Sequence, residues 1–169
     1  MKWNLDPAHS EVTFKVKHMM IANVTGKIGK FDVHVSTADD SFNNASIEFT
    51  GELASITTGD AQRDGHLKTA DFFHIEKYPN VTFRSSSFDG NKLKGDMTIN
   101  DITHPVDLDV ENGGVGKDPW GNTRIGFTVT GKISRKDWGL VWNASLETGG
   151  ILVSDEVKIN AEIQLVKQA

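Results

Sequence analysis

The sequence contains no cysteine among its 169 residues. Folds held together by disulfides, zinc sites built on thiolates and enzymes with a cysteine nucleophile are therefore excluded. A chain without cysteine suits oxidising and reducing compartments equally, so this absence does not indicate where the protein resides.

Basic residues are also too few to form a dominant surface, because 18 Lys and Arg stand against 23 Asp and Glu, for a net charge of -5. Phosphate binding requires a basic surface, so we expect no nucleic-acid partner. Long apolar runs are missing as well. No stretch approaches the roughly 18 to 20 apolar residues that a membrane helix needs, and we expect no integral membrane segment.

The amino terminus lacks the pattern of a secretory signal, which is a basic start followed by about 7 to 15 apolar residues. Instead, MKWNLDPAHS leads directly into sequence with the pattern of folded structure. We therefore expect a cytoplasmic protein. The alternative is a periplasmic protein whose export signal has been removed.

Strand-like alternation is the main pattern that is present. Val12, Phe14 and Val16 alternate with Thr13 and Lys15, and this period of two gives a strand one buried face. The same alternation recurs in residues 45–53, 92–99, 106–110, 125–133 and 157–165. Because such clean alternation is typical of an antiparallel sheet with one dry face, we predict an all-β fold.

Several of these segments run to about ten residues, which is long for a sandwich strand and usual for a tilted barrel strand. The chain is 37% hydrophobic, enough for one core, and no linker or repeat divides it. We predict a single domain over residues 1–169, an extended antiparallel up-and-down barrel of about eight strands, similar to a lipocalin. Such a barrel can hold an elongated ligand along its axis.

The segment RDGHLKTADFFHIEKYP, residues 63–79, has the composition of a metal or acid/base site. We predict a short helix here, near one end of the barrel, with Thr58 or Asp60 as its N-cap. Asp64 and His66 are two positions apart, whereas helical metal ligands are spaced i and i+4. We therefore predict no metal and interpret these residues as capping and hydrogen-bonding groups beside an apolar cluster that packs across the barrel end.

Two other polar side chains continue apolar faces: His18 follows the face of residues 12–16, and Arg135 follows that of residues 125–133. A charge on an inward face must be paired or lie close to water. For Arg135 the alternatives are a structural salt bridge at the barrel rim and an anchor for a ligand head group. The sequence contains no nucleophile elbow, phosphate loop, nucleotide fingerprint or EF-hand, so we predict no catalytic residue and no cofactor.

Five blocks resemble, in order, the signature segments of the YceI family: WNLDPAHSEVTFKVKHM, RDGHLKTADFFHIEKYPNVTF, GDMTINDITHPVDL, GFTVTGKISRKDWGLVW and SDEVKI. The resemblance spans nearly the whole chain. It implies an extended antiparallel barrel that encloses an apolar cavity, binding of polyisoprenoids or other long lipids, and a homodimer. It also implies a bacterial protein of a kind often exported to the periplasm, and it implies no reaction.

The predicted function is the binding, and the transport or storage, of a long-chain apolar ligand such as a polyisoprenoid, an isoprenoid quinone precursor or a fatty-acid derivative. The candidates for the polar mouth of its site are His18, Asp64, His66 and Arg135. The candidates for its apolar wall are Phe14, Val16, Ile47, Phe49, Phe83, Met97, Ile99, Phe127, Val129, Trp138 and Trp142.

Two alternatives belong to other functional classes. One is a metal-dependent or acid/base enzyme that uses Asp64 and His66, with His9 or His18 as a further participant. The other is a structural domain whose barrel is solid and whose FFHIEKYP cluster forms a dimer surface. The volume of the barrel interior distinguishes this second alternative from a ligand carrier.

Overall fold

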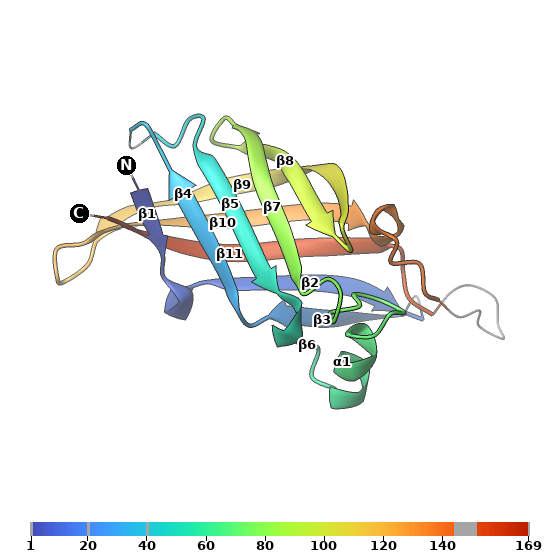
Figure 1. Cartoon of the computed structure of the whole chain (residues 1–169). Helices are drawn as coiled ribbons and strands as arrows, with labels where there is room; N and C mark the ends of the chain where they lie inside the picture. Colours follow the sequence, from blue (N-terminus) through green and yellow to red (C-terminus); the bar gives the residue numbers. More distant parts are fainter. Residues whose placement is uncertain (1, 20, 40, 144–151, 169) are drawn as a thin grey trace.

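The structure is a computed structural model that describes residues 2–19, 21–39, 41–143 and 152–168. This part of the chain forms strands, one short α-helix and three 3-10 helices (Figure 1). In chain order these elements are β1 (Lys2–Leu5), η1 (Pro7–His9), β2 (Glu11–His18), β3 (Ala22–Ile28), β4 (Phe31–Ser36), β5 (Ser46–Glu52), η2 (Leu53–Ser55), β6 (Ile56–Thr57), α1 (Ala61–Leu67), β7 (Asn80–Phe88), β8 (Lys92–Ile99), β9 (Ile102–Lys117), β10 (Thr123–Ser134), η3 (Arg135–Trp138) and β11 (Glu156–Lys167).

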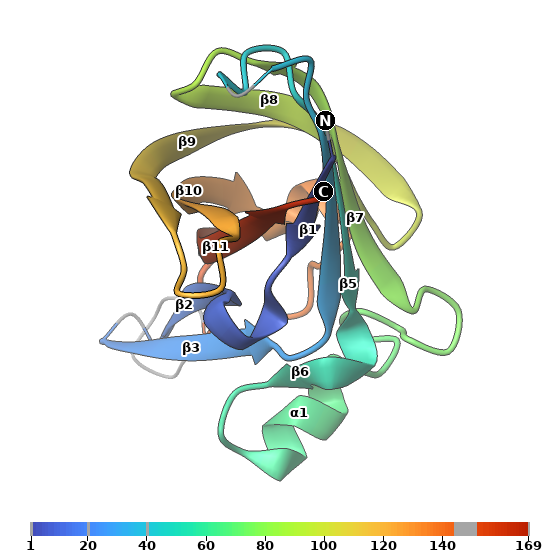
Figure 2. The ribbon, with the colours of Figure 1, turned by 90° about the vertical axis from the view of Figure 1, so that its left-hand side faces the viewer.

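Eight strands form a closed antiparallel barrel, as predicted. The order around the ring is β1, β4, β5, β7, β8, β9, β10 and β11, and β11 pairs with β1 again. β11 also pairs with β2 farther along its length, where Ile159 lies opposite Phe14. Because η1 separates β1 from β2, the strands β2, β3 and β6 leave the ring and form a flank beneath it (Figure 2).

The alternation seen in the sequence places one face of each barrel strand in the core. In β8, for example, Leu93, Met97 and Ile99 are buried. Met97 lies opposite Phe83 of β7, and Phe83 lies opposite Phe49 of β5, so the inward side chains of adjacent strands meet in register. The apolar faces therefore line a common interior.

The helix α1 lies at the end of the barrel opposite the two termini (Figure 1). Asp60 is its N-cap and accepts hydrogen bonds from the backbone N–H groups of Gln62 and Arg63, each at 3.0 Å, which confirms the predicted start. The following residues Phe72 and Phe73 pack against the core. The segment thus covers one barrel end, as its apolar composition predicted.

At the barrel end that carries the termini, Arg124 joins two carboxylates. Its Nη1 lies 2.5 Å from Asp6 Oδ2, and its Nε lies 2.8 Å from Asp118 Oδ2. Asp118 also accepts hydrogen bonds from the backbone N–H groups of Trp120 and Asn122 in the β9–β10 turn. The hydrogen bond from Arg124 lowers the pKa of Asp118 to about 2, against an opposing effect of desolvation.

The substitution Asp118→Asn is expected to lower the free energy of unfolding at neutral pH, because it removes the charge that Arg124 binds. The folded pKa of about 2 lies below the ordinary value of 3.8, so this contribution is complete above the ordinary value and is lost as the pH falls toward 2. Urea unfolding of both proteins at several pH values between about 3 and 7 measures the difference. A difference that does not shrink at low pH would contradict the assignment.

Candidate functional site: an apolar cavity in the barrel

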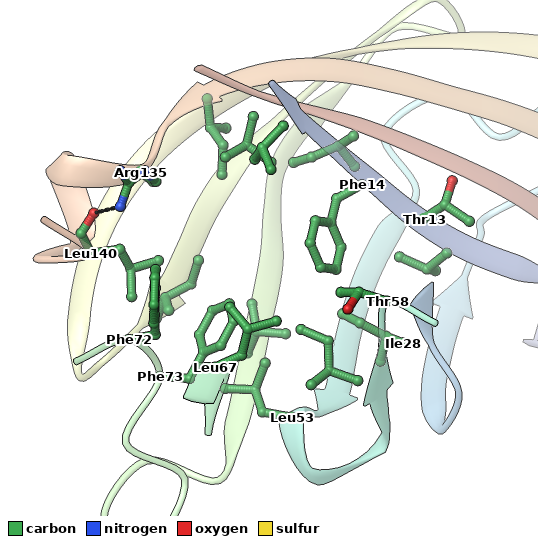
Figure 3. A pocket seen from close by; sticks show the side chains of 18 of the residues that line it. Thr13, Phe14, Ile28, Leu53, Thr58, Leu67, Phe72, Phe73, Arg135 and Leu140 are labelled. Atoms are coloured by element: carbon green, nitrogen blue, oxygen red, sulfur yellow. Dashed lines mark hydrogen bonds between the residues drawn. The ribbon is translucent and has the colours of Figure 1, made fainter. Parts of the chain in front are cut away.

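A cavity of about 730 Å³ lies inside the barrel. This volume is within the range of about 300 to 1,000 Å³ that small-molecule sites occupy. Figure 3 shows Phe14 projecting into the cavity from β2, while Leu67 of α1 and the neighbouring Phe73 project from the other side. The interior is therefore hollow, in contrast to the solid barrel of the structural alternative.

Most of the predicted wall residues lie on the cavity surface. These are Phe14, Val16, Ile47, Phe49, Phe83, Met97, Ile99, Val129 and Trp142. Their inward direction follows from the period of two, since each belongs to an alternating strand except Trp142, which lies in the segment after η3. That they contact a ligand stays a prediction.

The other two predicted wall residues, Phe127 and Trp138, do not reach the cavity surface. The ring of Phe127 packs against Phe42, with ring centroids 5.2 Å apart, beyond one end of the cavity. Trp138 is 2% exposed and lies in η3, where its indole N–H donates to Met97 O at 2.9 Å. Phe127 was placed on the wall from its inward direction alone, without its height along the barrel, whereas Trp138 was placed there as a large ring that fills a barrel interior.

Many wall residues were not among the predicted ones. Those on regular strands share the inward phase of the predicted set, so the alternation contains the signal that finds them. They include Val12, Val33, Val81, Leu93, Leu108, Ile133, Val157, Ile159, Ala161 and Ile163. Others lie in irregular segments where no periodicity marks them, namely Leu53, Phe72, Phe73, Leu140, Leu152 and Val153.

Phe14 reaches over β3 because its partner there is a glycine. Gly26 pairs with Phe14, and a Cβ atom on residue 26 would lie 2.1 Å from Cζ of the phenyl ring. No side chain tolerates such a contact, so the ring occupies the space that a side chain of β3 would otherwise fill. The glycine thereby fixes the position of one wall of the cavity.

Polar side chains reach the cavity around α1 and around the ends of β2 and β10, which lie at the same end of the barrel (Figure 1). They are Lys17, His18, Thr58, Asp60, Gln62, Arg63, His66 and Arg135. Among the described residues that line the cavity, Asp60 is the only carboxylate. The cavity is thus apolar over most of its surface and has a mainly basic polar end.

Three of the four predicted mouth residues, His18, His66 and Arg135, lie at this polar end. His18 pairs with Val153 as an isolated β-bridge. The Nε2 atom of His66 lies 2.8 Å from Asp71 Oδ2, and its ring meets Trp142 edge to face, with centroids 4.9 Å apart. His66 therefore connects α1 to the segment that follows η3.

The fourth predicted mouth residue, Asp64, is not among the residues that line the cavity. Its carboxylate accepts hydrogen bonds from the backbone N–H of Thr58 at 2.8 Å and from the hydroxyl of Thr58 at 2.6 Å. Asp64 and His66 thus have separate partners. Across the described ranges, no group of three or more His, Asp or Glu residues is arranged to hold a metal ion. His9, the other residue of the enzyme alternative, contacts Asp6 beside η1.

Arg135 is 6% exposed, and backbone carbonyl groups surround its guanidinium. The Nε donates to Ser154 O at 2.9 Å, and Nη2 donates to Val153 O at 3.3 Å. Nη1 donates to Leu140 O at 2.7 Å, drawn in Figure 3, and to Trp142 O at 2.9 Å. Burial lowers the pKa of Arg135, and the nearby Asp155 opposes this effect.

The side chain of Arg135 therefore joins residues 140–142 to residues 153–154 by hydrogen bonds. Within the described chain, no carboxylate forms an ion pair with Arg135, so carbonyl dipoles take the place of the predicted rim salt bridge. The guanidinium still reaches the cavity surface. Its contact with a ligand head group stays a prediction.

Known proteins share this architecture. A family model described as a YceI-like domain matches residues 3–165. The chain belongs to the YceI-like family. A UPF0312 protein of Staphylococcus aureus (strain N315) is 37% identical over 163 residues, which cover 96% of this chain and 95% of that protein.

Two solved structures show the same YceI-like barrel. The YCEI protein of Campylobacter jejuni is 31% identical, with a TM-score of 0.76 and 90% of each chain covered. A domain of Saccharophagus degradans is 14% identical, with a TM-score of 0.72 and 98% of each chain covered. That domain is described as a polyisoprenoid binding domain implicated in plant cell wall breakdown. The predicted family and fold are confirmed.

The chain thus combines a YceI-like domain over residues 3–165 with a hollow barrel interior. In the residues that the structure describes, no helix has the length and apolar character needed to span a bilayer.

Proposed function

We propose that this YceI-like protein is a non-catalytic carrier that holds a long-chain apolar ligand in its barrel for transport or storage. The ligand class is a polyisoprenoid, an isoprenoid quinone precursor or a fatty-acid derivative. The observation that carries the proposal is the cavity of about 730 Å³, whose wall is mostly apolar and whose polar side chains, apart from Thr13, gather at one end. An amphiphile with one polar end and one long tail matches this distribution.

The size of the cavity supports a ligand with a long tail. At about 30 Å³ for each group of the size of a water molecule or a methylene, 730 Å³ holds about 24 such groups. Each methylene removed from water contributes about 0.8 kcal/mol, so ten of them contribute about 8 kcal/mol. This is the free energy of a dissociation constant of about 1 μM before the costs of association are subtracted.

The polar end of the cavity supports the same ligand class. The side chains of Lys17, Arg63 and His66 lie there beside a single described carboxylate, that of Asp60. A polar or anionic head group has donors available at this end, whereas the rest of the wall offers contact with apolar side chains. The name of the Saccharophagus degradans domain adds support from a protein of the same fold.

Filling the cavity tests the proposal. Val129 of β10 lines the cavity, whereas the adjacent Thr130 is exposed on the outer face. The substitution Val129→Trp adds seven side-chain atoms to the interior and excludes a similar number of ligand carbons. We expect the affinity for a long-chain fatty acid to fall by more than about a hundredfold, at about 0.8 kcal/mol for each excluded methylene.

The measurement combines native mass spectrometry of lipid bound to the purified protein with displacement of a fluorescent fatty acid. Thr130→Trp is the matched control, because it adds a similar ring to the same strand on the other face, and it should leave the affinity unchanged. Absence of lipid from the wild-type protein in both assays would overturn the proposal. Equal affinity of the two tryptophan variants would place the ligand outside the barrel.

The homodimer that the family resemblance implies is part of this proposal. Analytical ultracentrifugation at several protein concentrations, with and without bound lipid, measures it. In the structural alternative the FFHIEKYP cluster formed the dimer surface, but its residues Phe72 and Phe73 also pack against the core. Their substitution therefore reports on stability as well as on association.

A further inference from the structure

The cavity stops part of the way along the barrel. Its surface includes Val33 of β4 and Ile163 of β11 but not Val35 and Leu165, which are the next inward residues of the same two strands toward the termini. Beyond the cavity, buried side chains of the core occupy the barrel interior, among them Val35, Ile125 and Leu165. The residues that fill it decide how far a ligand tail extends.

Three aromatic rings from separate segments stand where the cavity ends. Trp3 of β1 lies next to Val35, and Phe127 of β10 lies next to Ile163. Phe42, from the β4–β5 connection, lies between them. Its ring centroid is 4.9 Å from that of Trp3 and 5.2 Å from that of Phe127. We name Trp3, Phe42 and Phe127 the aromatic plug.

The plug is built with two features that oppose stability. Phe42 has a φ of 62°, a left-handed conformation that is a genuine outlier for a bulky side chain. The indole N–H of Trp3 is buried and has no hydrogen-bond partner in the part of the chain that the structure describes. Strained backbone and unpaired buried donors concentrate at sites selected for function, because packing alone does not favour them.

The strained conformation is held by local hydrogen bonds. The backbone N–H of Ala45 donates to Phe42 O at 3.1 Å, and the N–H of Asn44 donates to Phe88 O at 3.0 Å. These bonds fasten the connection to β7 and direct the Phe42 ring into the barrel, where it is 3% exposed. The plug is thus a fixed stop.

We infer that the aromatic plug is a specificity element that sets the maximum length of the ligand tail. The inference rests on the proposed function. The polar end of the cavity is at α1, and the plug lies beyond the other end, so a tail that fills the cavity, which has room for about 24 methylene-sized groups, cannot extend farther because the plug occupies the interior beyond it. Below that limit, each added methylene improves the dissociation constant about fourfold. Above it, an added methylene remains in water and gives no gain.

The substitution Phe42→Gly tests this role. It removes the ring, and glycine adopts the positive φ without strain, so part of the lost packing energy is offset. The space released is on the order of 100 to 150 Å³, the size of an engineered core cavity that takes up benzene, and it admits about four more carbons. Phe127→Ala is a second variant that opens the same space without altering the β4–β5 connection.

The experiment offers an equimolar mixture of saturated fatty acids of about 12 to 30 carbons, in phosphatidylcholine vesicles, to each protein. Native mass spectrometry then gives the chain lengths that each protein has bound. In the wild-type protein, the bound fraction should rise with length up to a limit. In Phe42→Gly or Phe127→Ala, that limit should move up by about four carbons.

Trp120→Ala is the matched control, because Trp120 lies in the β9–β10 turn with 81% of its surface exposed and contributes nothing to the cavity wall. It should keep the wild-type length limit. An unchanged limit in both plug variants, with lipid still bound, would overturn the role of the plug and leave the carrier function intact. Lipid uptake by none of the proteins would overturn both.

Discussion

Replacing Trp138 with alanine is expected to lower the free energy of unfolding by about 3 to 5 kcal/mol, the usual cost of deleting a large buried aromatic ring. Trp138 is 2% exposed, and its indole N–H donates to Met97 O at 2.9 Å. Its ring also meets His104 edge to face, with centroids 5.5 Å apart. The substitution therefore opens a hole behind β8 and β9 and leaves a buried carbonyl without its donor.

Two further variants separate these contributions. Trp138→Phe keeps most of the apolar surface but cannot donate to Met97 O, and we expect a loss of about 1 to 3 kcal/mol. Trp120→Ala removes the same side chain from an exposed turn and should change stability by less than about 0.5 kcal/mol. Urea unfolding followed by tryptophan fluorescence measures all three. A loss for Trp138→Ala no larger than that for Trp120→Ala would contradict the packing described for η3.

The barrel was predictable from the sequence because its main signal is local. The alternation of Leu93, Met97 and Ile99 with polar neighbours fixes which face of β8 is buried, and the same rule applies to most strands of the ring. The start of α1 at Asp60 was also predictable, since N-caps depend on residues within one turn. The cavity wall follows from these local rules wherever a regular strand passes it.

The ends of the cavity were not predictable in this way. Phe127 has the inward phase of β10, but it lies beyond the cavity because Phe42 enters the barrel from a connection with no periodicity. Trp138 was predicted on the wall as a large ring that fills the interior, but the chain turns into η3 at Arg135, and the indole donates to Met97 O instead of lining the cavity. Both differences arise from contacts between residues far apart in the chain, which alternation does not encode.

The arrangement of the strands also depends on contacts between distant residues, which the alternation does not encode. The sequence predicted about eight, and eight form the ring, but β2, β3 and β6 flank it. The segment with Asp6 and Pro7 folds into η1 and divides one long pairing with β11 between β1 and β2. Asp6 and Pro7 are visible in the sequence, but the pattern does not show that β2 leaves the ring after them. That outcome depends on the pairing of β4 with β1, which closes the ring.

Replacing Arg135 with methionine is the second substitution with a large expected effect, a loss of about 4 kcal/mol in the free energy of unfolding. The guanidinium donates to four backbone carbonyl groups, those of Leu140, Trp142, Val153 and Ser154, and all four lose this donor in the variant. The oxygen of Val153 keeps a second donor, the side-chain amide of Asn143 at 2.7 Å. An acceptor shielded from water and left unpaired costs about 1 to 3 kcal/mol, so the other three acceptors, in the lower part of this range, give this total. Methionine keeps the apolar stem in place, so the loss reports mainly on the hydrogen bonds.

In the folded Arg135→Met variant, the loss of stability should be concentrated in the segments that Arg135 joins. Leu140, Trp142 and Val153 line the cavity. Loss of their hydrogen bonds to Arg135 should therefore increase the mobility of the polar end, where His66 contacts Trp142. Hydrogen exchange should therefore accelerate in residues 140–143 and 152–154 well before the barrel strands exchange. Lys136→Met is the matched control, because Lys136 is the exposed neighbour in η3, and it should change stability by less than about 0.5 kcal/mol.

The same pair of variants decides between the two roles of Arg135. If Arg135 acts only by fastening the two segments, Arg135→Met should weaken the binding of fatty acids and of fatty alcohols of equal length by the same factor. If it also contacts a head group, the affinity for the acid should fall further than that for the alcohol, because a buried guanidinium interacts more strongly with a carboxylate than with a hydroxyl. Unchanged stability together with unchanged exchange in residues 140–143 and 152–154 would refute the fastening role.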